Sequence, residues 1–192
     1  MRVAAFVVFL LLGWLQAAQA ADLGAPLVLV AKPQLQDPVY GRTVLLVVPL
    51  GADQHAGFIL NRPTVMTLGK VFPEHGPSQK VVNPIYLGGP VESGLIFALV
   101  QRPITPGGKS FQMAPGLFAA YEAEVVDRII ETEPHTARFM AGFVAWKTGE
   151  LRAEIEAAAW YVQAADAALL KRPPEGLWEN LVHRLQQALN AI

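Results

Sequence analysis

Gly107-Gly108-Lys109-Ser110 contains the GKS ending of a phosphate-binding P-loop, which is the sharpest hint of small-ligand chemistry in this sequence. A P-loop also needs a glycine five positions before Gly108, where this chain has Pro103. The motif should open a helix, but the residues after Ser110 do not have a helical pattern. We therefore interpret this segment as a loop with an exposed lysine rather than as a nucleotide cradle.

Residues for nucleophilic or metal chemistry are equally sparse. None of the serines lies in a G-x-S-x-G motif, and the absence of cysteine excludes a thiolate metal site, a cysteine nucleophile and a disulfide framework. The histidines show neither HExxH nor paired spacing. Glu131, Glu133 and His135 come nearest to a metal cluster, but Pro134 interrupts them and a solvated helix end explains them better. The sequence predicts no catalytic residue, no metal and no cofactor, so an enzyme is the less favoured interpretation.

Several turns carry more polar residues than a plain connection requires. Brought together, their side chains would form a small polar pocket with a charge-assisted pair and backbone donors from the glycines. The alternative is that Asp37 and Arg62 only tie loops together. The candidate ligand-binding or partner-binding residues are Asp37, Arg42, Asn61, Arg62, Gly88 and Gly89.

Composition favours one globular domain without affinity for nucleic acid. The chain has 192 residues, of which 53% are hydrophobic and 16% charged, enough apolar material for one substantial core. Fifteen basic and 16 acidic residues give a formal net charge of −1, with no block of like charges. Nothing in this pattern is suited to neutralising a phosphate backbone, so nucleic acid is not an expected partner.

The N-terminus has the three regions of a secretory signal. Arg2 precedes an apolar run from Val3 to Leu15, and Ala18-Gln19-Ala20 matches an A-x-A cleavage site. The alternative is an uncleaved anchor, but a helix over this run would be about 20 Å long, against a hydrocarbon core of roughly 30 Å. We expect residues 1–20 to be a cleaved signal and residues 21–192 to form one exported domain without a membrane span, with the periplasm as the expected location.

Most predicted strands lie in the first half of the chain. Apolar, β-branched runs bounded by turn residues indicate strands, and the polar residues 51–57 predict a hairpin connection. Residues 73–83 and 103–116 are expected to be loops, because proline and glycine recur in both. The predicted strands are 27–31, 43–48, 57–60, 95–100, 139–146 and 160–163, and residues 84–87 are also strand-like.

Helices follow mainly in the second half, which favours an α+β fold over a doubly wound sheet. A short helical turn is predicted at 68–72, an amphipathic helix at 121–131, and a final helix opened by Pro173-Pro174. Between them, residues 150–158 are predicted to be helical, with Thr148 as N-cap and an Arg152–Glu156 pair on the outer face. We expect Trp146 and Trp160, which flank this helix, to be core residues that hold it on the sheet.

Four ordered motifs resemble the YqgE/AlgH family and together extend from about residue 27 to the C-terminus. The last motif places Trp160 after a G-E-L-x-x-E-I segment. The motifs are Pro33-x-Leu35-x-Asp37-Pro38, Gly57-Phe58-Ile59-Leu60-Asn61-Arg62-Pro63, Leu87-Gly88-Gly89-Pro90-Val91 and Gly142-Phe143-x-x-Trp146-x-x-Gly149-Glu150-Leu151-x-x-Glu154-Ile155.

The resemblance implies an α+β domain whose mixed, bifurcated β-sheet curls into a pseudo-barrel flanked by helices. Most members of this family have no assigned biochemical role, and one branch carries a transcriptional-regulator label. The sequence departs from the family where polar residues are usual: it has Pro49-Leu50-Gly51-Ala52 after the second strand, Val100 for a histidine and Ala159 for an asparagine.

The leading hypothesis is an exported, non-enzymatic protein that binds a protein or small-molecule partner through the residues around Asp37 and Arg62. A transcriptional regulator is the alternative that the family label suggests, although the net charge, the predicted export and the lack of a basic recognition helix oppose it. A small hydrolase centred on Asp37 is the third hypothesis.

Overall fold

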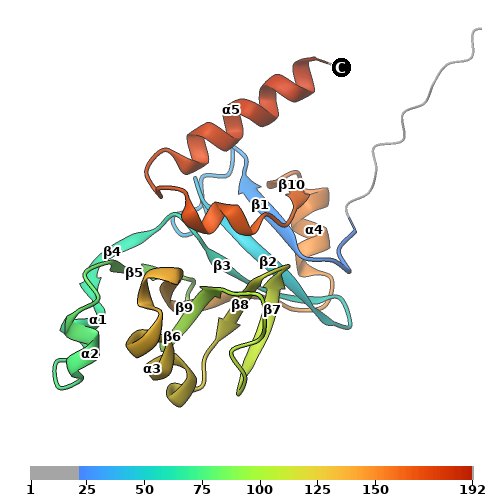
Figure 1. Cartoon of the computed structure of the whole chain (residues 1–192). Coiled ribbons are helices and arrows are strands. Elements are labelled where there is room, and N and C mark those ends of the chain that lie inside the picture. Colours follow the sequence, from blue (N-terminus) through green and yellow to red (C-terminus); the bar gives the residue numbers. More distant parts are fainter. Residues whose placement is uncertain (1–21, 192) are drawn as a thin grey trace, which may run out of the picture.

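A computed structural model describes residues 22–191, which fold around one curled β-sheet (Figure 1). The predicted signal, residues 1–20, lies outside the described residues. Ten strands form the sheet in the order β10-β1-β2-β3-β9-β6-β8-β7, and β4 and β5 lie off this path. The strands are β1 (Leu27–Ala31), β2 (Val44–Gly51), β3 (Gln54–Ile59), β4 (Pro63–Thr67), β5 (Pro84–Leu87), β6 (Val91–Gln101), β7 (Ser110–Ala114), β8 (Leu117–Ala120), β9 (Ala137–Trp146) and β10 (Trp160–Ala164).

Helices cover the outer face of this sheet and close one end of its inner face. The outer face packs on α3 and α4, whereas η2 and α5 contribute buried leucines to the core inside the curl. Figure 1 shows α3 beside β6 and α5 beyond the opposite end of the sheet. The helices are α1 (Leu68–Val71), α2 (Gly76–Gln79), α3 (Ala123–Thr132), α4 (Glu150–Glu156) and α5 (Leu177–Asn190), with the 3₁₀ helices η1 (Pro134–Thr136) and η2 (Ala167–Lys171).

The central strands are apolar on both faces because each face meets its own core. In β6, Phe97 and Leu99 point into the core inside the curl, while Ala98 and Val100 pack under α3. Every residue of β1 is buried. The continuous apolar runs in the sequence thus follow from burial on both sides, since a half-exposed strand would alternate.

The sheet bifurcates at Gly88, where the chain leaves β5. The N–H of Gly88 donates to Ala141 O in β9 and its carbonyl accepts from Ile59 N at the end of β3, each at 2.8 Å. A Cβ on Gly88 would lie 2.2 Å from Gly142 O, and one on Gly89 would lie 2.2 Å from the carbonyl carbon of Phe143. Only glycine permits this approach, so the glycine pair is a strand junction and not a phosphate cradle.

Most predicted elements are confirmed, and the α+β fold with a curled, bifurcated sheet is as the sequence and the resemblance predicted. Two predicted loops contain further elements: α2 lies in 73–83, and β7 begins in 103–116 and is followed directly by β8. The hairpin connection is also shorter than predicted, because only Ala52 and Asp53, with φ of 49° and 57°, separate β2 from β3. In residues 103–116, glycine and proline therefore belong to turns next to strands and not to one continuous loop.

Three local predictions about helices are wrong. Gly149, not Thr148, occupies the N-cap of α4, and the Thr148 hydroxyl donates instead to Ala52 O at 2.9 Å. Arg152 pairs with Asp53 across the β2–β3 turn, with Nη2 and Oδ1 3.1 Å apart, and not with Glu156. The final helix begins at Leu177, after Gly176 with a φ of 70°, and so starts beyond the two prolines.

The junction makes a prediction about stability. Gly88→Ala should lower the free energy of unfolding by about 3 kcal/mol or more, because the added methyl group meets the main chain of β9, which cannot move without breaking the sheet. Chemical denaturation measures this loss. Gly94→Ala in β6 is the matched control, since a Cβ there meets nothing within 4 Å. Equal stability of the two variants would contradict the account of the junction.

Candidate functional site

Asp37, Arg42, Asn61 and Arg62 lie around the loop between β1 and β2. Their polar atoms are used to hold this loop. Asp37 Oδ1 accepts from the N–H groups of Val39 and Tyr40, both at 2.8 Å, which makes a tight Asx-type turn. Among residues 22–191 no ion pair joins Asp37 to Arg62, so the expected charge-assisted pair does not form.

Asn61 and Arg62 bind the main chain of this loop from the end of β3. Asn61 Oδ1 accepts from Val44 N at 2.9 Å, and its Nδ2 donates to Arg42 O at 3.0 Å. Arg62 Nη2 donates to Gly41 O at 2.7 Å. These contacts fix the start of β2 relative to β3, so their evident role is structural.

Arg42 joins the same loop to the final helix. Its guanidinium donates to Glu179 and lies 5.0 Å from the centre of the Trp178 ring, while the Trp178 indole donates to Ala31 O at 2.7 Å. The hydrogen bond from Arg42 lowers the pKa of the Glu179 carboxyl below its usual value. The first turn of α5 is therefore held against the loop and the end of β1 by the contacts of Arg42 with Glu179 and Trp178 and by the Trp178 hydrogen bond.

Gly88 and Gly89 lie next to this cluster through the Leu87 N–H, which donates to Arg62 O at 2.8 Å. The Gly88 N–H is already bonded to β9, so it is not available to a ligand. None of the six predicted residues is among those that line five cavities of the described residues, the aromatic pocket below included. Binding through this surface stays a prediction.

The two tryptophans beside α4 are buried core residues, as predicted, and share one carboxylate. The indole N–H groups of Trp146 and Trp160 donate to Glu154 Oε2 at 3.0 and 2.8 Å. Tyr40 packs edge-on against Trp160, and burial, followed by the charges of Glu154 and Asp37, raises the pKa of its hydroxyl. Sequence reasoning missed the role of Glu154, although its position between two tryptophans was a usable signal.

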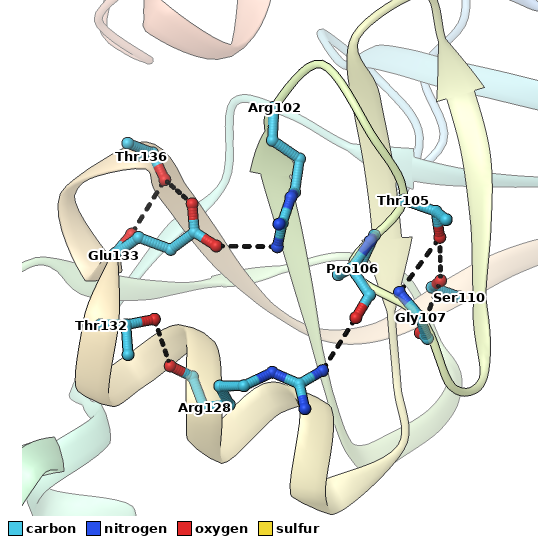
Figure 2. A network of polar contacts seen from close by, with 9 residues as sticks. All are labelled: Arg102, Thr105, Pro106, Gly107, Ser110, Arg128, Thr132, Glu133 and Thr136. Carbon is cyan, nitrogen blue, oxygen red and sulfur yellow. Dashed lines mark hydrogen bonds and ion pairs between the residues drawn. The ribbon is translucent and has the colours of Figure 1, made fainter.

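The GKS segment is a closed loop, which confirms its interpretation from the sequence. Lys109 is followed by β7 and not by a helix. Figure 2 shows Thr105, Gly107 and Ser110 bonded to one another, and Arg128 of α3 donating to Pro106 O at 2.8 Å. The loop's polar groups satisfy each other instead of facing a ligand.

An ion pair forms at the acidic C-terminal end of α3. Arg102 Nη1 lies 3.0 Å from Glu133 Oε1, and the Thr136 hydroxyl donates to Glu133 O (Figure 2). Within residues 22–191, no three histidine, aspartate or glutamate side chains are grouped so that they could hold a metal ion. Glu133 is therefore a structural residue that joins η1 to the end of β6.

An aromatic pocket of about 410 Å³ opens at the end of the curled sheet away from η2. Gln101 at the far end of β6 bonds to Ala167 of η2, whereas Leu95 and Phe97 at the near end line the pocket. All eight lining residues are apolar or aromatic: Leu50, Ala56, Phe58, Leu95, Phe97, Phe111, Tyr121 and Phe143.

Phe97 is the centre of the aromatic pocket. Its ring contacts those of Phe58, Tyr121 and Phe143, with centroids 5.0, 5.7 and 5.7 Å away and mostly edge-on. At the rim, Leu50 is 58% exposed. Sequence reasoning noted that the segment 49–52 is apolar here but missed the pocket, because its residues come from strands far apart in the chain.

Fold and site together define an α+β half-barrel with an apolar cavity lined by aromatic rings. The family model described as AlgH-like matches residues 28–190. This chain therefore belongs to the AlgH-like family, and the resemblance found in its motifs is confirmed.

Similar proteins agree with this assignment. A UPF0301 protein of Thermobifida fusca is 33% identical over 168 residues, covering 81% of this chain and 84% of that relative, and one of Streptomyces coelicolor is 30% identical over 166 residues, covering 81% and 83%. The solution structure of AlgH from Pseudomonas aeruginosa matches with a TM-score of 0.70 at 26% identity, covering 92% of this chain and 97% of that one. A crystal structure of a Corynebacterium diphtheriae protein, at 22% identity and a TM-score of 0.68 over 84% and 86% of the chains, shares the fold.

No helix within residues 22–191 combines the length and the apolar character needed to span a bilayer.

The loop contacts make a second prediction. Asn61→Ala should lower the free energy of unfolding by about 1–3 kcal/mol, because it leaves the buried N–H of Val44 without an acceptor. Thermal or urea denaturation measures the change. Asn83→Ala, at an exposed position without a side-chain hydrogen bond among the described residues, should be nearly neutral. If Asn61→Ala is also neutral, the loop does not depend on this bond.

Proposed function

We propose that this protein is an exported, non-enzymatic binding protein that takes up a small apolar molecule in the aromatic pocket. The observation that carries this proposal is the lining itself, in which every residue is apolar or aromatic and the rim is open to solvent. Small-molecule sites have volumes of about 300–1,000 Å³ and mostly apolar walls, and the pocket of about 410 Å³ lies within that range.

The energetics favour an apolar occupant over a polar one. Leu50, Leu95 and Tyr121 keep 58%, 36% and 36% of their surface exposed, and a ligand that covers them removes this apolar area from water. Each square ångström so covered contributes about 25 cal/mol. A charged ligand would lose its hydration without a partner, because no lining residue carries a charge.

The apolar residues at the end of β2 support a ligand preference particular to this chain. Leu50 lies in the segment Pro49-Leu50-Gly51-Ala52, where the family resemblance implies acidic and histidine residues. Here its side chain lines the pocket. Exchanging polar for apolar residues at the rim would shift the pocket's preference towards apolar ligands.

Export is supported by the signal-like N-terminus, residues 1–20. Leu23, close behind the predicted cleavage site, is buried, and its carbonyl oxygen lies 2.9 Å from His55 Nε2. Cleavage after Ala20 would keep Leu23 and its contact with His55 in the mature protein.

The pocket predicts binding of a neutral aromatic probe. N-phenyl-1-naphthylamine should bind the mature protein with a rise in fluorescence, and Leu50→Asp/Leu95→Asp should weaken binding at least about tenfold, because carboxylates at the rim must be desolvated beside the probe. Fluorescence titration measures both. Val65→Asp/Ile104→Asp, the same change at exposed positions outside the pocket, should bind as the wild type does. Absence of probe binding, or equal loss in both variants, would refute the apolar site.

Export makes a separate prediction. In a Gram-negative host, residues 1–30 fused to alkaline phosphatase should give activity in the periplasm, and the mature full-length protein should start at Ala21 by N-terminal sequencing. Replacing Ala18 and Ala20 with bulky residues should block cleavage, since small residues are needed at an A-x-A site. Phosphatase fusions without activity would contradict export and leave the pocket proposal untouched.

A further inference from the structure

A second cavity lies at the other end of the molecule and has an opposite character. It measures about 640 Å³ and is bounded by the start of β5, the turn from η1 into β9, and the chain that leaves η2. We call it the basic cavity. Its lining residues are Asn83, Pro84, Tyr86, Gln101, His135, Thr136, Ala137, Arg138, Leu170, Lys171, Arg172, Pro173 and Pro174.

Apart from Tyr86, every ionisable side chain in this lining is basic. His135, Arg138, Lys171 and Arg172 border the cavity, and no aspartate or glutamate does. Three acidic side chains lie close to the cavity but outside its lining. Glu133 Oε2 accepts from the Thr136 hydroxyl at 3.3 Å, Asp166 approaches Arg172 at 3.9 Å, and Glu175 is close enough to act on Arg138. A concave site lined by one sign of charge concentrates ions of the opposite sign.

Arg138 forms the floor of the basic cavity without a carboxylate partner. Its guanidinium donates to three main-chain carbonyls, Leu60 O at 2.8 Å, Leu170 O at 2.5 Å and Arg172 O at 3.2 Å, and lies 4.4 Å from the centre of the Tyr86 ring. None of the ion pairs among residues 22–191 includes it. Burial accordingly lowers the pKa of Arg138, because its charge is desolvated without an anion in contact.

The same hydrogen bonds position the other cations. Arg138 holds the carbonyls of Leu170 and Arg172, the residues on either side of Lys171, and so fixes the main chain that carries the Lys171 and Arg172 side chains. Lys171 is exposed and makes no side-chain hydrogen bond to a described residue. Its ammonium is free to meet a ligand, with Arg138 acting as the positioning residue below it.

From this geometry we infer that the basic cavity binds a small organic anion through a phosphate or carboxylate group, with Lys171 and Arg172 in contact with the anion. The remaining walls suit the organic part of such a ligand, since Pro84, Pro173, Pro174 and Leu170 are apolar. This site is separate from the aromatic pocket, with which it shares no lining residue. Its test therefore stands apart from that of the proposed function.

Titration calorimetry at low ionic strength, with pyrophosphate and citrate as probes, tests the inference on the mature protein. At least one probe should bind, and Lys171→Ala/Arg172→Ala should weaken it at least about tenfold through loss of two charge-assisted contacts. Pyrophosphate alone would identify a phosphate site, citrate alone a carboxylate site, and both a site selective for charge. The backbone NMR signals of Thr136, Ala137 and Lys171 should shift with the same affinity.

The control variant is Lys109→Ala/Lys147→Ala, which removes the same charge from exposed positions outside the cavity. It should change affinity less than about threefold, since charges outside the cavity act on the anion only through water, where the attraction is weak. Lys171→Gln alone serves if the double variant does not fold. No binding of either probe, NMR shifts elsewhere, or equal weakening by the control would overturn the inference.

Discussion

The main-chain contact of Gly88 with β9 is the constraint on which the rest of the structure depends. Gly88 bridges Ile59 at the end of β3 and Ala141 in β9, so that one edge of β9 serves β3 along one half and β5 along the other. The chain can enter this junction only because Gly88, Gly89 and Gly142 bring backbone against backbone. Bifurcation lets the long strands β6 and β9 curl while β4 and β5 leave the sheet as a separate arm (Figure 1).

Curling gives the sheet an inside with two unlike ends. At one end η2 and α5 add Leu169, Leu177 and Leu181 to the core, and the basic cavity forms beside the chain leaving η2. At the other end no helix of the described chain covers Phe97 and its neighbours, so the core continues into the aromatic pocket. The pocket is thus the uncovered end of the hydrophobic core. That origin explains why its lining is apolar throughout.

Local and periodic patterns in the sequence predicted most of the fold but few features of the sites. Continuous runs such as Leu27–Ala31 and the four-residue spacing in α5 reflect burial of the element itself, and the sequence alone revealed them. In contrast, β7 was hidden between glycines and prolines that form hairpin turns. The polar cluster around Asp37 could be located, since Asn61 and Arg62 stand at a strand end, but its partners are main-chain atoms that no side-chain pattern marks. Leu50, Phe97 and Phe143 meet only through the sheet order, which requires the fold.

The central claim is that the uncovered end of the core receives an apolar ligand. Isotope-filtered NOE spectroscopy of the protein with N-phenyl-1-naphthylamine tests it most directly, because it reports which protons the probe touches. The account predicts NOEs from the probe to ring protons of Phe97, Phe111 and Phe143 and to the methyl groups of Leu50. NOEs confined to other surfaces, or none to these rings at saturating probe, would contradict it.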